Sequence, residues 1–275
     1  MSYPIASVKN LTVRRGANVV VDDVSFELLA ESDTALVGPN GAGKSSLVAS
    51  LLGLIPRVSG DINIMGTKMN KAGYLPKSIR ERISYIPQNF SFQGQFPLSV
   101  FEFVQLGLSN SSSFLRMRDS RTKILVHRSL ERTDTFNLRR RLLSELSGGE
   151  LKRVMLAFCI VRPRDLLVLD EVQAGLDIPS TQRFQKMLFE LRRQEGWTVL
   201  HISHDIDMVL RSSDQVLGLN RRLCCRGVPN LALTSERLSV LYGPNIVSYQ
   251  HQCRGWMTAI GRTTHETVQR HSAWR

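Results

Sequence analysis

The chain has 275 residues, of which 42% are apolar, and this is enough for one large domain or for one domain with appendages. No apolar run reaches the roughly 20 residues of a membrane-spanning helix, the first residues lack the pattern of a signal peptide, and four unevenly spaced cysteines do not resemble a disulfide framework. The net charge of +12 is compatible with nucleic acid, anionic lipid or a nucleotide as partner, and alone it does not choose among them.

Residues 34–54 read as an apolar strand, a glycine-rich turn and an amphipathic helix. The turn matches the phosphate-binding P-loop pattern G-x-x-x-x-G-K-[ST], in which backbone N–H groups and a helix N-terminus surround phosphate oxygens. Lys44 is expected to reach the outer phosphates and Ser45 to ligate Mg²⁺. The residues predicted to bind nucleotide here are Gly38, Pro39, Asn40, Gly41, Ala42, Gly43, Lys44, Ser45 and Ser46.

Residues 96–107 predict the start of a helix with an apolar face, and residues 142–163 predict a second helix. The second helix opens with Ser147, Gly148 and Gly149, which offer a hydroxyl, bare N–H groups and a positive dipole end to an anion. From these residues alone, a simple helix cap is the alternative interpretation.

Residues 164–172 contain four consecutive apolar residues followed by two acids, as expected for a strand buried on both faces of a parallel sheet. Ligands bind at the carboxyl ends of such strands. Asp170 is therefore the candidate to hold Mg²⁺, and Glu171 is the candidate base that orients the attacking water. A solvated strand end is the alternative, which the neighbouring P-loop motif disfavours.

The stretch "LSGGE" ahead of this strand resembles the signature of ABC-type ATPases. The resemblance covers roughly residues 5–245 and implies an α/β P-loop NTPase fold: a RecA-like parallel-sheet core, an antiparallel β subdomain and an α-helical subdomain at about 90–162. ATP and Mg²⁺ are the implied cofactors.

The resemblance also implies roles for further residues. Gln88 matches the Q-loop residue that senses Mg²⁺ and contacts the transport partner, Asp177 matches the D-loop that couples two subunits, and His204 matches the switch histidine at the γ-phosphate. Ser147 and Gly149 of one subunit would complete the ATP site of the other, which implies a head-to-tail dimer with two composite sites.

Three positions depart from the family pattern. Arg15 stands where the family usually has an aromatic residue that stacks on adenine, and a guanidinium plane can also stack on a base. Val172 replaces the usual proline after the catalytic glutamate, and residues 28–35 lack the usual glycine turn. These changes leave every catalytic group in place.

The composition changes near residue 220. Residues 221–275 carry eight arginines, no lysine and two acids, so we predict an ATPase domain at 1–220 and a C-terminal hairpin with a basic, histidine-containing tail at 221–275. The tail residues His251, Cys253, His265 and His271 are of metal-ligating types, but their spacing and the arginines beside them favour a flexible basic segment near anionic lipid.

Residues 217–229, "LGLNRRLCCRGVP", resemble the same region of the ATPase subunit of bacterial zinc importers. The alternation of side chains along a strand predicts that Cys224 and Cys225 point to opposite faces, with Cys225 on the inner face beside Leu223, so that they do not share a metal ion. The resemblance implies zinc uptake through a membrane permease and a periplasmic metal-binding protein, with this subunit peripheral at the cytoplasmic face of the inner membrane.

Manganese and iron importers are the alternatives for the cargo. An ABC-type ATPase acting on nucleic acid is suggested by the charge, but the chain has one nucleotide domain and no heptad-patterned insertion between Gln88 and Ser147, so no nucleic-acid partner is expected. A P-loop kinase would leave the signature and His204 without a role.

Overall fold

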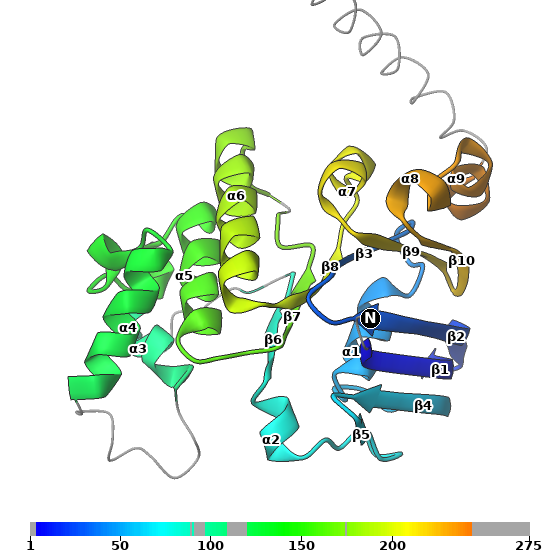
Figure 1. The fold of residues 1–275 in the computed structure, drawn as a ribbon, viewed down its shortest axis with the longest axis horizontal. Helices are drawn as coiled ribbons and strands as arrows, with labels where there is room; N and C mark the ends of the chain where they lie inside the picture. The colour runs from blue at the N-terminus through cyan, green and yellow to red at the C-terminus, as the bar shows by residue number, and fades with distance from the viewer. Residues whose placement is uncertain (1–3, 89, 91–96, 109–119, 174, 244–275) are drawn as a thin grey trace, which may run out of the picture.

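The structure is a computed structural model that describes residues 4–88, 90, 97–108, 120–173 and 175–243. Two sheets and a layer of helices make up the molecule (Figure 1). The smaller sheet is antiparallel, in the order β2-β1-β4-β5. Its strands are β1 (Pro4–Arg15), β2 (Asn18–Leu29), β4 (Ser59–Ile64) and β5 (Thr67–Lys68).

The larger sheet has six strands in the order β10-β9-β3-β8-β7-β6, all parallel except for the antiparallel β9–β10 pair. Its strands are β3 (Asp33–Val37), β6 (Ile83–Ile86), β7 (Leu166–Asp170), β8 (Thr198–Ile202), β9 (Gln215–Asn220) and β10 (Arg222–Gly227). Every residue of β7 and β8 is buried, which explains their unbroken apolar runs.

Three apolar clusters join the sheets and helices. The first lies between the two sheets and includes residues of α1 (Lys44–Leu51). The second packs β6, β7 and β8 against the helical layer, which stands at the side of the molecule away from the antiparallel sheet (Figure 1). The third packs β3, β9 and β10 against the C-terminal helices.

The remaining helices frame these clusters. They are α2 (Lys77–Arg80), α3 (Val100–Leu106), α4 (Ser120–Arg132), η2 (Phe136–Leu138), η3 (Leu143–Glu145), α5 (Gly148–Ile160), α6 (Ile178–Glu195), α7 (Ile206–Ser212), α8 (Pro229–Ala232) and α9 (Ser235–Tyr242). The arrangement confirms the predicted α/β fold, with its parallel core, antiparallel β subdomain and helical subdomain. In the part of the chain that the structure describes, no helix is long and apolar enough to cross a membrane.

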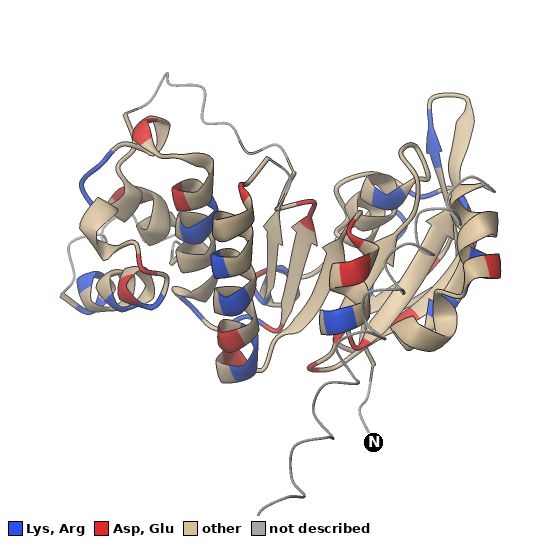
Figure 2. Ribbon diagram, turned by 90° about the horizontal axis from the view of Figure 1, so that it is seen from above, with Lys and Arg blue, Asp and Glu red and all other residues tan. Residues whose placement is uncertain are grey.

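Basic and acidic residues are interspersed along the helices (Figure 2). Several of them form ion pairs between elements, such as Arg132 of α4 with Glu195 of α6 at 2.6 Å. Part of the positive charge in the described residues is therefore partnered within the molecule.

Residues 28–35, which lack the usual glycine, still form a turn before β3. Glu31 adopts a left-handed conformation with φ of 60°, and its backbone N–H donates to Thr198 Oγ1 at 2.9 Å. A non-glycine residue pays a conformational cost there, and this hydrogen bond helps to offset it. The turn before β3 therefore forms without glycine.

The prediction that Cys225 shares the inner face of Leu223 is wrong. The β9–β10 register shifts between these two residues, and Leu223 packs against the first cluster while Cys225 is buried in the third. Cys224 also packs against the third cluster. The cause is a β-bulge, because one extra residue on a strand interrupts the alternation of side chains.

Candidate functional site

The P-loop follows β3, and two of its glycines lie close to the backbone of neighbouring strands. Gly38 and Gly43 have φ of 154° and 97°. A Cβ atom at Gly38 would lie 2.0 Å from the carbonyl oxygen of Leu219, and one at Gly43 would lie 2.1 Å from that of Val20. Both positions therefore require glycine, since any side chain would collide with backbone of β9 or β2.

The β9–β10 turn braces this loop from outside. The N–H of Arg221 donates to the carbonyl of Ala42 at 2.9 Å, and the N–H of Asp22 donates to the carbonyl of Arg221 at 2.8 Å. Arg222 adds an ion pair to Asp22 at 2.6 Å. The C-terminal hairpin thus contacts the phosphate loop directly and continues the main sheet, while the predicted domain boundary near 220 stays a prediction.

Lys44 is 5% exposed and lies beneath the loop. Its Nζ donates to the carbonyl of Gly38 at 2.8 Å and to that of Pro39 at 3.0 Å. Burial lowers the pKa of Lys44, and the nearby charges of Glu171 and Asp170 oppose that shift. The arrangement holds a cation, which attracts phosphate, at the start of α1.

Asp170 ends β7 and is 4% exposed. The hydroxyl of Ser45 donates to its Oδ1 and that of Tyr85 to its Oδ2, both at 3.3 Å. Burial raises the pKa of Asp170, and these two hydrogen bonds act in the opposite direction. The carboxylate and the Ser45 hydroxyl form an all-oxygen donor set of the kind that Mg²⁺ prefers.

Glu171 brings together the predicted catalytic residues. Its carboxylate accepts a hydrogen bond from Gln88 Nε2 at 2.5 Å through one oxygen and contacts Nε2 of His204 through the other. Gln88, Glu171 and His204 follow the parallel strands β6, β7 and β8, so the sheet delivers all three to one edge. Glu171 itself has φ of 47°, an uncommon backbone conformation that is often found at functional sites.

A cleft of about 640 Å³ opens over the loop. Its lining consists of most of the predicted P-loop residues and the three strand ends, with one addition from β2: Val20, Asn40, Gly41, Ala42, Gly43, Lys44, Ser45, Ser46, Gln88, Glu171 and His204. The predicted residues Gly38, Pro39 and Asp170 are not among them. Val20 was missed because a single valine in an alternating strand carries no sequence signal of a ligand site. Its backbone carbonyl is also the group that excludes a side chain at Gly43.

The signature residues lie elsewhere. Ser147 caps α5 through a hydrogen bond from the N–H of Glu150 to its hydroxyl, and the Glu150 carboxylate accepts from the N–H of Ser147 at 2.8 Å. Gly149 faces Ser180 of α6, whose N–H donates to Asp177 at 2.8 Å. The residues that line the cleft include none of Ser147, Gly148, Gly149 and Asp177.

Arg15 ends β1, where it pairs with Asn18 across the β1–β2 turn. Its side chain is exposed, and Arg15 is not among the residues that line the cleft. Its contact with adenine therefore stays a prediction.

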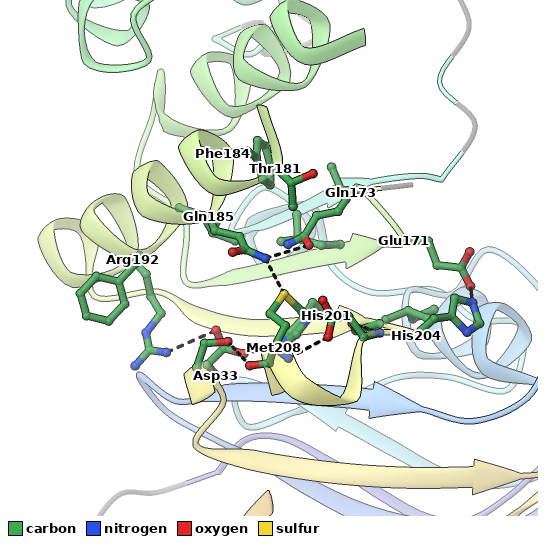
Figure 3. A pocket seen from close by; sticks show the side chains of 18 residues that line it. Asp33, Glu171, Gln173, Thr181, Phe184, Gln185, Arg192, His201, His204 and Met208 are labelled. Atoms are coloured by element: carbon green, nitrogen blue, oxygen red, sulfur yellow. Dashed lines mark hydrogen bonds and ion pairs between the residues drawn. The ribbon is translucent and has the colours of Figure 1, made fainter. Parts of the chain in front are cut away.

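A second cavity, of about 330 Å³, lies between α6 and α7 and shares Glu171 and His204 with the cleft (Figure 3). Among the lining residues, Gln185 of α6 donates to Gln173 at 3.1 Å and to the sulfur of Met208 at 2.8 Å. No sequence motif indicates this cavity, because its walls come from elements that only tertiary packing brings together.

The other end of the second cavity is ionic (Figure 3). Asp33 lies 3.0 Å from Nε2 of His201 and 3.4 Å from Arg192, and Arg192 also pairs with Asp214 at 3.0 Å. These contacts join α6 to the start of β3.

Cys224 and Cys225 are free thiols. Across the described ranges, no group of three or more His, Cys, Asp and Glu residues is placed to hold a metal ion. The tail residues His251, Cys253, His265 and His271 lie outside the described residues.

Comparison with known proteins gives a consistent result. The sequence profile described as ABC transporter matches residues 21–174. The chain is 34% identical over 269 residues to the zinc import ATP-binding protein ZnuC of Alcanivorax borkumensis, covering 96% of this chain and 95% of that one. It is 30% identical over 243 residues to the manganese transport system ATP-binding protein MntB of Listeria innocua, covering 88% and 98%.

Among solved structures, cbiO1 of Clostridium perfringens, part of the ABC transporter complex cbiONQ, is similar with a TM-score of 0.73. It is 26% identical, and the match covers 90% of this chain and 99% of that one. The P-loop, the three converging strand ends and these similarities together show that the chain belongs to the ABC transporter family.

Proposed function

We propose that this chain is the ATP-hydrolysing subunit of a bacterial ABC importer that takes up zinc. The observation that carries the ATPase assignment is the Glu171 carboxylate, held between Gln88 and His204 at the mouth of a cleft built on the P-loop. The family match and the similarity to ATPases of metal importers support the transport role.

In this function each group has a distinct task. Glu171 accepts a proton from the attacking water, and the P-loop N–H groups with Lys44 stabilise negative charge on the phosphates. His204 contacts Glu171, so in this function one imidazole would contact both the base and the γ-phosphate. Gln88 joins the base to the segment that leads into the helical subdomain.

Ser45 and Asp170 would hold the Mg²⁺ of the nucleotide, with Gln88 as the further predicted ligand. Their oxygen donors fit a small hard cation. Bound there, the metal ion would supply charge neutralisation at the phosphate oxygens.

The signature residues support a dimer. Ser147 and Gly148 are exposed at a helix N-terminus that the cleft of the same chain does not use. A second copy in head-to-tail orientation would place them against the nucleotide, which gives two composite sites per dimer.

The further partners are a membrane permease and, through it, a periplasmic metal-binding protein. The subunit then works at the cytoplasmic face of the inner membrane, with α3 toward the permease. Ser99 caps α3 through a complete capping box, so this predicted contact region has a firm helix start.

The identity of the transported metal ion is tested in cells. Deletion of the gene should lower cellular zinc, measured by mass spectrometry, and should prevent growth under zinc chelation, with rescue by zinc but not by manganese. Complementation with the wild-type gene should restore both cellular zinc and growth. Complementation with the gene for the Glu171→Gln variant should restore neither. If manganese or iron alone restored growth, that metal ion would be the cargo in place of zinc.

The ATPase assignment is tested on the purified chain. Magnesium-dependent phosphate release should be measurable and should disappear in Lys44→Ala. Chains that bind DNA with a steep salt dependence, and that hydrolyse ATP only with DNA present, would instead favour a nucleic-acid function.

A further inference from the structure

Tyr85 is a polar residue that the mechanism above does not use. It lies in β6 and pairs with Val168 of β7, two residues before Asp170. Its ring packs against the apolar cluster between the two sheets, which fixes where its hydroxyl can reach. That hydroxyl donates to Oδ2 of Asp170 at 3.3 Å.

The Asp170 carboxylate is therefore held from two sides. Ser45, at the start of α1, donates to Oδ1, and Tyr85 donates to Oδ2 from β6. The terminal torsion of an aspartate is broad, so one hydrogen bond leaves the plane of the carboxylate poorly defined. A second donor on the opposite oxygen defines that plane.

The two donors differ in what else they face. Ser45 lines the nucleotide cleft, whereas Tyr85 is not among the residues that line it. A tyrosine hydroxyl is protonated at neutral pH, so that of Tyr85 remains a donor to Asp170. The Tyr85 contact is thus available whether or not Ser45 turns toward a metal ion or phosphate.

We propose that Tyr85 is a positioning residue for the Mg²⁺ of the nucleotide: by donating to Oδ2, it orients the Asp170 carboxylate for the metal ion. This inference rests on the proposed function, in which Asp170 and Ser45 hold Mg²⁺. Tyr85 acts through Asp170 and does not touch the metal ion or the nucleotide.

The test compares Tyr85→Phe with the wild type in the full chain. Phenylalanine keeps the buried ring and removes only the hydroxyl. In the presence of ADP, the Kd for Mn²⁺, measured by electron paramagnetic resonance, should rise about three- to tenfold, as expected for the loss of one intramolecular hydrogen bond of ordinary net strength. The Kd for ATP measured in EDTA should stay the same, because that binding does not use Asp170.

Two further variants separate positioning from general damage. Tyr74→Phe makes the same chemical change at an exposed tyrosine and should leave both constants unchanged. In an Asp170→Asn background, Tyr85→Phe should weaken Mn²⁺ binding no further, because the two residues act as one unit. Thermal unfolding of each variant sets a temperature at which all of them are folded.

The possible failures are distinguishable. Unchanged Mn²⁺ affinity in Tyr85→Phe, with normal binding by the wild type, would overturn the role of Tyr85 alone. An equal loss in the Asp170→Asn background would show an effect that does not pass through Asp170, and would also overturn it. A wild type that binds neither ATP nor Mn²⁺ with ADP would overturn the proposed function itself.

Discussion

The ends of β6, β7 and β8 bring Gln88, Glu171 and His204 into contact, whereas the start of α5 lies outside the cleft that these residues line. The first region is assembled by one chain, because adjacent parallel strands end at the same edge of the sheet. The second region presents Ser147 and Gly148 on the surface. The proposed head-to-tail dimer would account for this difference, because one chain would form part of each site and a second copy would complete it.

The two regions also differ in how charge relates to stability. Burial raises the pKa of Asp170, so its charged form is disfavoured in the fold. The backbone N–H of Ser147 lowers the pKa of Glu150, so that charge is favoured. The charge of Asp170 at the end of β7 lowers stability, and the charge of Glu150 at the signature helix increases it.

The largest expected effect is loss of the base. Glu171→Gln should lower ATP hydrolysis about 10³-fold while ATP binding persists, because the amide cannot accept the proton of water. With ATP and Mg²⁺ the variant should elute as a dimer by light scattering. Glu190→Gln on the exposed face of α6 is the matched control. Hydrolysis at the wild-type rate would refute the assignment of Glu171.

Mixing two inactive variants tests whether the two regions complete each other across a dimer. Lys44→Ala disables the P-loop, and Ser147→Asp places a carboxylate at the signature while keeping a good helix cap. In a head-to-tail mixed dimer, one site has both defects and the other has none. An equimolar mixture should recover about a quarter of wild-type hydrolysis, since half the dimers are mixed and each has one intact site.

A mixture no more active than the sum of its parts would show that the signature does not act across the dimer. Circular dichroism of Ser147→Asp serves as the folding control, because α5 should keep its helical content.

Removal of the charge at the signature helix should destabilise the fold. Glu150→Gln is expected to lower the free energy of unfolding by about 0.3 to 1 kcal/mol at pH 7, the typical value of a negative charge near a helix N-terminus, since glutamine can keep the capping box. Because the pKa of Glu150 is lowered in the fold, its contribution is present at neutral pH and is lost as the pH falls through that pKa. In urea unfolding, the loss of stability caused by Glu150→Gln should be smaller at pH 4 than at pH 7. A cost independent of pH would contradict the explanation by charge.

The smallest effect has the opposite sign. Asp170→Asn should raise Tm by about 2 °C at pH 7.5 in the absence of nucleotide, because it removes a buried charge. Since the pKa of Asp170 is raised, the cost of its charge grows as the pH rises through that pKa and is absent below the ordinary value of 3.8. The gain in Tm should therefore shrink toward pH 4. A lower Tm at pH 7.5 would show that the hydrogen bonds from Ser45 and Tyr85 outweigh burial.

The sequence predicted the fold and the residues that meet at the cleft because each motif is local and the parallel sheet brings strand ends together. It did not predict Val20, Tyr85 or Gln185, whose roles arise from contacts between elements far apart in the chain. The bulge between Leu223 and Cys225 also has no sequence signal, since a strand with one extra residue still reads as a strand.

The brace between the β9–β10 turn and the P-loop has a consequence for synthesis on the ribosome. The Arg222–Asp22 contact joins residues 200 positions apart. At ordinary elongation rates, the P-loop is made roughly 10 to 40 seconds before the turn that supports it. The phosphate loop then has its full support only when β10 has emerged from the ribosome. Nascent chains that end before β10 should not retain nucleotide. Nucleotide binding by a nascent chain is thus expected only after β10 has been made.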